Sequence, residues 1–386
     1  MTAASAPTGL PPGSSPTGSS QSDSSPPGSF LAGSFLAGAR DRLWDAMSHH
    51  DQDASTAVVL AALDAGLSVE SALLDLIAPV QTRVGAEWAA NRVSVAQEHV
   101  ATAISERIIT VLADLPGARP PARLGRITVA CVDHEWHALP ARLLSQVLTL
   151  RGWQVDFLGA RVPTPHLIAQ LHRTGPDAVA LSSSLPTHLP TAHATITACQ
   201  ATGMPVLVGG AAFGPDGRYA RLLGANAWAP DARTAAETLR KGIPRPDPLT
   251  PHLVSDDLPH LADQEYTLVA RSGTGLVAGT LAGLERRYPP LRDYTDRQRH
   301  RTAEDIARIV DFLAAALYVD DDELFAGFLT WTAEILTARD VPAPSLLPAL
   351  AALRDELRDF PRCARVLDHA RTVLDRRIGA APTGPE

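Results

Sequence analysis

The stretch Cys131-Val-Asp-His-Glu-Trp-His-Ala-Leu-Pro140 decides how the middle of this chain folds. An apolar run, Ile127–Val132, leads into it, and a helical pattern from Ala138 to Arg151 follows it. A buried strand, a loop and a helix in this order are the first unit of an α/β sheet. Glu135 and His137 therefore stand at the carboxyl end of a strand, where open α/β sheets bind ligands. An imidazole at that place can coordinate a metal.

Four more units of strand and helix follow in the region that ends near Lys241. Each expected strand is a short apolar run, and a helical pattern comes after it. This alternation predicts a doubly wound parallel sheet of five strands. The expected strands are Ile127–Val132, Gln154–Leu158, Ala178–Ser182, Val206–Val208 and Ala227–Ala229.

The rest of the sequence predicts a multidomain chain with α and α/β parts. Residues 1–37 are rich in Ser, Pro and Gly and are expected to be a disordered tail. Residues 38–117 repeat apolar positions every three or four residues, which predicts a helical bundle. The α/β domain is expected over residues 125–243 and a proline-rich linker over residues 244–260. Residues 261–378 have a helical pattern throughout.

The composition argues for a cytoplasmic protein. The net charge is −8, so no basic field indicates binding to nucleic acid or to a membrane. The three cysteines, Cys131, Cys199 and Cys363, lie far apart without a CxxC motif. This spacing argues against a disulfide framework or a zinc site and fits a reducing cytosol. No apolar run reaches the roughly 18 residues of a membrane span, and no basic region marks a secretion signal.

Two further strand ends carry a run of serines or a pair of glycines. Leu181-Ser-Ser-Ser-Leu185 ends the third expected strand, and Val208-Gly-Gly-Ala-Ala-Phe213 ends the fourth. Each motif alone is common in loops, and a histidine at a strand end is more often a loop residue than a ligand. Together, at one edge of a sheet, they suit a bulky ligand that approaches the main chain closely. The candidate residues are Ser182, Ser184, Gly209 and Gly210.

The loop resembles the cobalamin-binding domain of methionine synthase, of corrinoid methyl carriers and of CarH-type repressors. Their loop reads Asp or Glu, any residue, His, two residues and Gly, whereas this chain has Pro140 in the last position. The resemblance implies that His137 is the lower axial ligand of the cobalt and that Glu135 orients it. A carboxylate beside an imidazole fixes its tautomer and raises its basicity. The serine and glycine stretches match the family's pocket for the nucleotide loop.

A second resemblance lies in the helical region. Trp88, nine residues and then Glu98-His99 is the pattern that CarH-type bundles carry. It implies that Trp88, Glu98 and His99 contact an upper adenosyl group, because an indole can stack on adenine and a carboxylate can bind ribose hydroxyls. On the residues alone, Trp88 could be a core aromatic and Glu98-His99 a solvated helix turn.

The sequence departs from CarH-type repressors in two places. Those repressors begin with a helix-turn-helix domain, whereas this sequence starts with a Pro/Ser/Gly-rich stretch. Direct binding to nucleic acid is therefore not expected. They also often carry a histidine directly after the tryptophan, where this chain has Ala89. A histidine that caps cobalt after photolysis would have to come from elsewhere, for example His99.

The C-terminal region resembles a globin or phycobilin fold. A cobalamin-like domain followed by a globin-like domain resembles the photocobilin group, which binds a bilin such as biliverdin beside cobalamin. A cluster of Arg, Tyr and His near an aromatic residue suits a tetrapyrrole with two propionates. A solvated basic helix face is the alternative for any single arginine. No cysteine lies in the cluster, so we expect a non-covalent bilin. The candidate residues are Tyr288, Tyr294, Arg297, His300, Arg301 and Trp331.

The sequence thus predicts an adenosylcobalamin-dependent photoreceptor in which light cleaves the cobalt–carbon bond and changes domain or subunit contacts. The expected partners are a light-dependent homodimer or oligomer and an unknown effector protein. No Ser/His/Asp set, phosphate-loop lysine or HExxH motif is present, so no enzyme is expected. A corrinoid methyl carrier and a light-independent cobalamin or haem sensor remain as alternatives.

Overall fold

The computed structural model describes residues 27–246 and 258–379. These residues form two compact units. The first unit holds the chain up to Ser184, together with Ala198–Arg221 and the segment that starts at Ala225. The second unit holds Leu185–Thr197, Leu222–Gly224 and the C-terminal helices. The centre of the expected linker, residues 247–257, lies outside the described residues. None of the described helices is both long and apolar enough to span a membrane.

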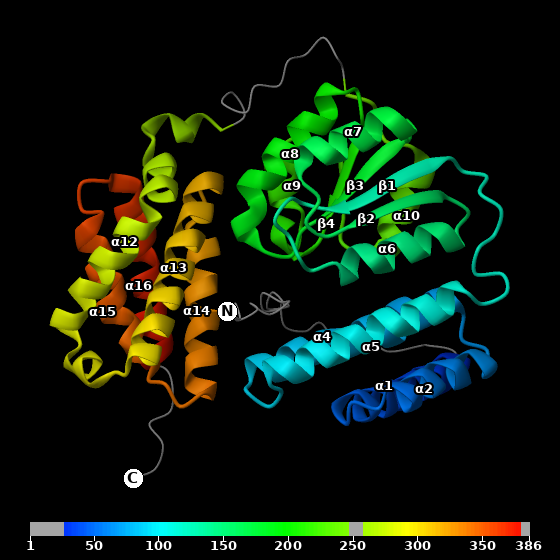
Figure 1. Ribbon diagram of the computed structural model, residues 1–386, viewed down its shortest axis with the longest axis horizontal. Helices are drawn as coiled ribbons and strands as arrows, with labels where there is room; N and C mark the ends of the chain where they lie inside the picture. The colour runs from blue at the N-terminus through cyan, green and yellow to red at the C-terminus, as the bar shows by residue number, and fades with distance from the viewer. Residues whose placement is uncertain (1–26, 247–257, 380–386) are drawn as a thin grey trace. The chain divides into compact units, whose positions relative to one another are not determined.

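The N-terminal part of the first unit is a bundle of helices (Figure 1). Short polar side chains set the helix starts, because they bind backbone N–H groups that have no partner in the helix. The side chain of Asp51 accepts from the N–H of Ala54 at 2.8 Å, and Ser94 forms a capping box with Gln97. The expected helical bundle is confirmed. Its elements are α1 (Pro27–Ser48), α2 (Gln52–Asp64), α3 (Val69–Ser71), the π-helical turn η1 (Ala72–Ile77), α4 (Ala78–Ala89) and α5 (Val95–Ala113).

The expected disordered tail, residues 1–37, is wrong over its last part. Helix α1 begins at Pro27, so the repeated Ser-Phe-Leu-Ala-Gly motif is helical. Further along the helix, Ala39, Leu43 and Met47 repeat every four residues and are buried. This apolar face secures the helix against its neighbours, and a proline is tolerated in the first turn because its N–H would have no helical partner. Residues 1–26 lie outside the described part of the chain.

The turn η1 is a π-helical insertion in a helix that otherwise continues from α3 to α4. Pro79 explains it, because a proline has no N–H to donate to the carbonyl four residues earlier, which is that of Asp75. The N–H of Ala78 donates to the carbonyl of Leu73, five residues back. The carbonyl of Asp75 accepts instead from Nε of Arg40, in α1, at 2.6 Å. The proline thus accounts for the π-helical geometry of η1, and it leaves the carbonyl of Asp75 available to Arg40 of α1.

The sheet has five parallel strands in the order β2-β1-β3-β4-β5 (Figure 1). The predicted fold class is confirmed, and each strand differs from its predicted range by at most a residue at either end. Strands β2 and β3 flank β1, so the chain changes direction at β1, and ligands of such sheets bind at the carboxyl ends there. The strands are β1 (Arg126–Cys131), β2 (Gln154–Gly159), β3 (Ala178–Ser182), β4 (Val206–Gly209) and β5 (Ala227–Ala229).

Helices cover both faces of the sheet. The helices α6 and α10 lie on one face, and α7 lies on the other (Figure 1). This placement follows from right-handed crossovers between parallel strands. The helical elements are α6 (Leu139–Leu150), α7 (Thr164–Thr174), η2 (Pro186–His188), α8 (Leu189–Ala201), η3 (Ala211–Phe213), α9 (Arg218–Leu222) and α10 (Ala232–Lys241).

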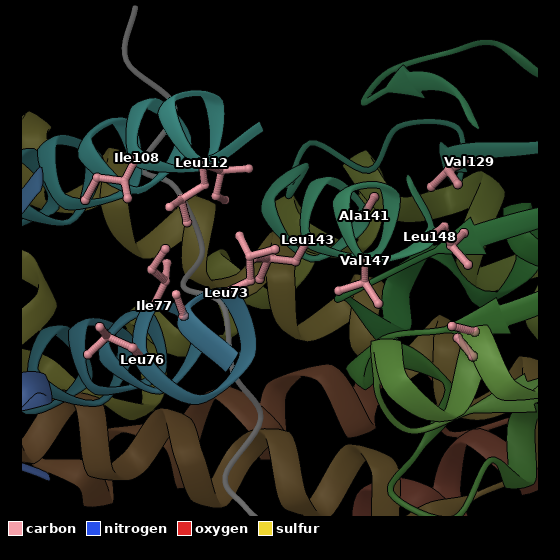
Figure 2. Close-up of a cluster of buried hydrophobic side chains, with 14 of the residues drawn as sticks. Leu73, Leu76, Ile77, Ile108, Leu112, Val129, Ala141, Leu143, Val147 and Leu148 are labelled. Atoms are coloured by element: carbon pink, nitrogen blue, oxygen red, sulfur yellow. The ribbon is translucent and has the colours of Figure 1, made fainter. Parts of the chain in front are cut away.

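One hydrophobic core joins the bundle to the sheet. Figure 2 shows side chains of η1 and α5 on one side of the interface and side chains of α6 on the other. Leu73 and Leu143 extend toward each other across this interface. Because buried apolar area stabilises in proportion to its extent, this shared core holds the bundle on α6. The labelled residues are Leu73, Leu76, Ile77, Ile108, Leu112, Val129, Ala141, Leu143, Val147 and Leu148.

The described C-terminal residues of the second unit are helical, as the sequence predicted; the globin-like fold stays a prediction. The buried carboxylate of Glu265 secures the start of the last helix by accepting from the N–H groups of Arg362 and Cys363, at 3.0 and 2.7 Å. The elements are η4 (Pro259–Asp263), α12 (Glu265–Arg287), η5 (Pro289–Asp293), α13 (Asp296–Val319), α14 (Asp322–Ala338), η6 (Ala343–Ser345), α15 (Leu346–Glu356) and α16 (Pro361–Gly379).

Candidate functional site

The loop after β1 places Glu135 and His137 against each other. Nδ1 of His137 lies 2.5 Å from Oε1 of Glu135. The glutamate is fully buried, and only 7% of His137 is exposed. An ionised carboxylate only accepts hydrogen bonds, so Nδ1 is the donor in this pair. The lone pair of the neutral imidazole then resides on Nε2, which is the atom able to bind a metal.

The carboxylate of Glu135 is surrounded by donors. Its Oε1 also accepts from the N–H groups of Trp136 and His137, both at 3.0 Å. Its Oε2 accepts from the N–H of Ser184 at 2.7 Å and from the hydroxyl of Ser183 at 3.3 Å. These hydrogen bonds compensate for burial of the charge and fix the direction of the carboxylate. The carboxylate in turn fixes the plane of the imidazole.

The loop accommodates the proline that stands where the related domains have glycine. Pro140 occupies the first turn of α6, where no backbone N–H is needed for the helix. His134 supplies the turn with a positive φ of 67°. The ring of Trp136 lies beside that of His137, with centroids 3.9 Å apart. Pro140 is therefore compatible with a loop that presents His137.

The serine and glycine strand ends meet next to Glu135. Ser182 pairs with Gly209 across β3 and β4, and the N–H of Ser183 donates to the carbonyl of Gly209 at 3.1 Å. Gly210 has φ +99°, and a Cβ there would lie 2.2 Å from the carbonyl oxygen of Ser183. Only glycine allows the two loops to approach this closely. The predicted residues Ser182, Ser184, Gly209 and Gly210 therefore share one sheet edge.

The middle serine of the triplet was missing from the predicted site. The sequence predicts Ser182 and Ser184 as site residues, yet the hydroxyl that reaches Glu135 belongs to Ser183, which is fully buried. Ser184 contributes its backbone N–H instead. Alternation along a strand assigns side chains to two faces, but the strand ends at Ser182 and the alternation stops there. The sequence signal was the run of three serines, without an indication of which member bonds to the carboxylate.

The predicted upper-face residues lie at one end of the α4–α5 hairpin. Trp88 is half-buried near the end of α4, and Glu98 and His99 lie in the first turns of α5. Nδ1 of His99 is 2.7 Å from Oε2 of Glu98 and 2.9 Å from the carbonyl of Val95. The hydroxyl of Thr102 donates to Oε1 of Glu98 at 3.2 Å. Their contact with an adenosyl group stays a prediction.

The candidate bilin residues are distributed over several helices of the second unit. Tyr288 and Tyr294 flank η5, and burial raises the pKa of Tyr294, as does its hydrogen bond with Tyr288. The exposed residues Arg297, His300 and Arg301 lie in the first turns of α13. Trp331 lies on α14, where its ring centroid is 6.5 Å from that of Phe328. The structure thus joins the two tyrosines, and the bilin site stays a prediction.

The donor set fits a corrinoid. A buried imidazole whose Nδ1 is held by a carboxylate could offer Nε2 to a cobalt ion. Next to it, Gly210 lets the loop after β4 pack directly on the backbone of Ser183, since a Cβ there would lie 2.2 Å from its carbonyl oxygen. This packing supports the loop whose serines hold Glu135, and the imidazole supplies the nitrogen donor that a cobalt ion requires.

Comparisons with known proteins identify the two halves of the first unit. Sequence models of the B12 binding domain match residues 125–240 and residues 39–113. The HTH-type transcriptional repressor CarH of Myxococcus xanthus is 32% identical over 178 residues, which are 45% of this chain and 58% of the relative. CarA, a repressor of the same organism, is 30% identical over 144 residues, which are 37% of this chain and 47% of the relative.

The fold and the site thus define a cobalamin-binding protein with a helical and a sheet-based B12 binding domain. Over these domains the chain is similar to the CarH-type repressors. It spans about half the length of the curated relatives it matches. Those relatives are named as transcriptional repressors.

Solved structures of corrinoid proteins are similar to about half of the chain. The monomethylamine corrinoid protein of Methanosarcina barkeri shares 17% identity, with a TM-score of 0.46, over 53% of this chain and 98% of that protein. A cobalamin-binding protein of Desulfitobacterium hafniense shares 21% identity, with a TM-score of 0.30, over 54% of this chain and 97% of that protein.

Proposed function

We propose that this protein is a photoreceptor that binds adenosylcobalamin between its helical bundle and its sheet, and reports light through a change in the docking of the bundle. The observation that carries the proposal is the buried Glu135–His137 pair at the carboxyl end of β1. Adenosylcobalamin supplies, when bound, a cobalt–carbon bond that visible light breaks. The residues of the chain bind, orient and read out that group.

On the lower side, His137 would offer Nε2 to the cobalt while Nδ1 donates to Glu135. Glu135 keeps the imidazole in one tautomer and one orientation, because Ser183 and Ser184 hold the carboxylate from the other side. Gly209 and Gly210, at the end of β4, would let the nucleotide arm of the cofactor approach the main chain, because they carry no side chain. These roles support cobalamin in general and do not depend on its upper ligand.

On the upper side, Trp88 would stack on the adenine, and Glu98 would bind the ribose hydroxyls, with His99 next to it. The bundle that carries these residues shares its core with α6. Loss of the adenosyl group would remove contacts that only the bundle makes. The equilibrium between docked and undocked bundle would then shift by the free energy of those contacts. A homodimer, an oligomer or an effector protein would receive that change.

A corrinoid methyl carrier is the second candidate, because the same strand-end histidine would serve it equally well. It requires neither Trp88 nor the Glu98–His99 pair. Methylcobalamin should bind more tightly than adenosylcobalamin if this candidate holds. The discriminating variant is Trp88→Ala, which should weaken only the adenosyl form if the chain is a photoreceptor.

A bilin in the second unit is a separate part of the proposal. Tyr288 and Tyr294, with the exposed Arg297, His300 and Arg301, offer hydroxyl and cationic groups to two propionates. Biliverdin added to the purified chain should then give a red-absorbing complex. Tyr294→Phe should weaken it. A haem spectrum in the chain as purified would favour the sensor alternative instead.

The central test uses the full chain, reconstituted in the dark with adenosylcobalamin. We expect a bound spectrum with a histidine lower ligand and a change of that spectrum after visible light. His137→Ala should abolish the histidine-ligated spectrum. His134→Ala is the matched control, because His134 lies in the same loop but is exposed. A chain that binds no cobalamin, or whose bound spectrum ignores light, overturns the proposal.

A further inference from the structure

The bundle and the sheet domain are joined by an ion-pair network outside their shared core. Arg233, at the start of α10, directs NH1 and NH2 at the two oxygens of Asp75, at 2.8 and 2.6 Å. Its Nε lies 3.2 Å from Oε1 of Glu70. Arg151, after α6, holds the same glutamate with Nε and NH2, at 3.0 and 2.8 Å. Both arginines come from the sheet domain and both carboxylates from the bundle.

The geometry makes these pairs stronger than ordinary surface pairs. The contacts of Arg233 with Asp75 and of Arg151 with Glu70 are two-pronged, which restricts orientation and strengthens the interaction. The side chains are only 24–38% exposed, so salt screens them less than a fully solvated pair. The arginines lower the pKa of both carboxyl groups, and the carboxylates raise the pKa of both arginines.

Packing under this network is incomplete. A cavity of about 510 Å³ opens between η1, the start of α6 and the start of α10. Leu74 and Ala78 line it from the bundle, and Pro140 and Leu143 line it from α6. Apolar walls that face a void lose the dispersion contacts of a close-packed interface. The ion pairs therefore supply contacts between the bundle and the sheet domain at a place where apolar packing is incomplete.

The carboxylate that Arg233 grips twice belongs to η1. Asp75 lies in the π-helical turn, and its backbone carbonyl is already held by Arg40 of α1. The ion pair of Arg233 with Asp75 therefore connects the sheet domain to η1 and, through Arg40, to α1. Pro140 lines the cavity and comes three residues after His137, so the network lies close to the loop that presents the cobalt ligand.

We propose that Arg233, together with Asp75 and Glu70, forms a latch that keeps the bundle docked on the sheet domain and thereby sets the rate at which cobalamin enters and leaves. The inference rests on the proposed site between bundle and sheet. Arg233 acts as a positioning residue, because it contacts the bundle rather than the cofactor. When the ion pairs of Arg233 break, the bundle can move away from the sheet domain and expose the proposed cobalamin site. When they form again, the bundle returns to the docked state, with or without cofactor.

Cobalamin kinetics in the dark test the latch. In Arg233→Gln, association and dissociation of hydroxocobalamin should both become roughly three- to tenfold faster, the range for loss of one two-pronged, half-buried ion pair. Their ratio, the dissociation constant, should change little, because the latch is closed in both states. If Arg233 instead contacted the cofactor, its replacement would raise the dissociation rate alone. Arg233→Lys should lie between, since it keeps the charge and loses the fork.

Salt provides an independent readout. Between about 0.01 and about 1 M NaCl the screening length falls from roughly 30 to roughly 3 Å. Association with the wild-type chain should accelerate over this range, whereas Arg233→Gln should respond little. The matched control is Arg221→Gln, which removes an exposed pair with Asp216 inside the sheet domain. That variant should keep both the wild-type rates and their salt dependence.

Hydrogen–deuterium exchange of the cobalamin-free chain separates the latch from the proposed function. Amides of α6 and α5 at the bundle interface, among them those of Val147 and Leu112, should exchange faster in Arg233→Gln and in Asp75→Asn. This result is expected even if the chain binds no cobalamin, a finding that would overturn the photoreceptor and the control of cobalamin exchange but not the latch between bundle and sheet domain. Exchange and association rates equal to those of the wild type in both variants overturn the latch.

Discussion

Oε1 of Glu135 lies 2.5 Å from Nδ1 of His137, and the other oxygen of the same carboxylate accepts from the backbone N–H of Ser184 at 2.7 Å. The glutamate therefore connects the loop after β1 to the loop after β3. Through this connection the sheet itself, and not only the local loop, determines the direction of the imidazole. Such an arrangement gives a single histidine the preorganisation that a metal ligand requires.

The first prediction concerns this carboxylate. Glu135→Gln keeps the shape of the side chain but loses its charge and one acceptor, so the tautomer of His137 is no longer fixed. We expect cobalamin binding to weaken by roughly ten- to a hundredfold, the usual effect of removing such a partner. Titration of the chain with hydroxocobalamin, followed by absorbance, measures it. Asp133→Asn in the same loop serves as the control and should bind like the wild type.

The second prediction concerns Gly210. An alanine there would combine a φ of +99° with a Cβ 2.2 Å from the carbonyl of Ser183. We expect Gly210→Ala to lower the free energy of unfolding by about 2–4 kcal/mol, from backbone strain plus overpacking. Denaturant titration measures it. Gly203→Ala is the comparison, because Gly203 also has a positive φ but has open space around it. A smaller loss at Gly210 than at Gly203 would contradict the close approach.

The third prediction concerns the cysteines, which are buried and form no disulfide. Burial raises the pKa of the Cys199 thiol to about 12 and raises that of the Cys363 thiol as well. Because the thiolate is the reactive form, the native chain should react slowly with a disulfide reagent at about pH 8. In guanidinium all thiols should react at once. Rapid labelling of Cys199 in the folded chain would show that α8 is more open than the structure has it.

The fourth prediction concerns acid. Arg151 lowers the pKa of Glu70 from 4.5, and Arg233 lowers that of Asp75 from 3.8, with a smaller contribution from Arg40. Since the folded-state values lie below the unfolded ones, the pairs stabilise fully above about pH 4.5. Their contribution is lost as the pH falls through the lowered values.

Thermal unfolding at a series of pH values measures this loss. The double variant Glu70→Gln, Asp75→Asn should be less stable than the wild type near neutral pH. The two melting temperatures should converge as the pH falls well below 3.8, the ordinary value for aspartate. A difference between the two chains that stays constant with pH would show that charge is not the source of the stabilisation.

Local sequence patterns were sufficient to predict the strands, most of the helices and the Glu135–His137 pair. The alternation of apolar runs with helical patterns placed the five strands, because β1, β3 and β4 are buried and largely apolar along their length. Glu135 and His137 are two residues apart, so a short loop suffices to bring them together. The start of α1 was missed because the composition of residues 27–37 resembles a linker, and only the buried face further along the helix explains its order.

What the sequence by itself determined is therefore the fold class, the strand ends and the Glu135–His137 pair, all of which depend on neighbours in the chain. Only the tertiary structure decided that Ser183, 48 residues away, donates to Glu135, and that Arg233 pairs with Asp75 across 158 residues. The physical reason is that the period of a strand or helix indicates which side of the element a residue occupies. The partner on that side depends on strand order and on how the bundle docks, and both are set by burial of the shared core.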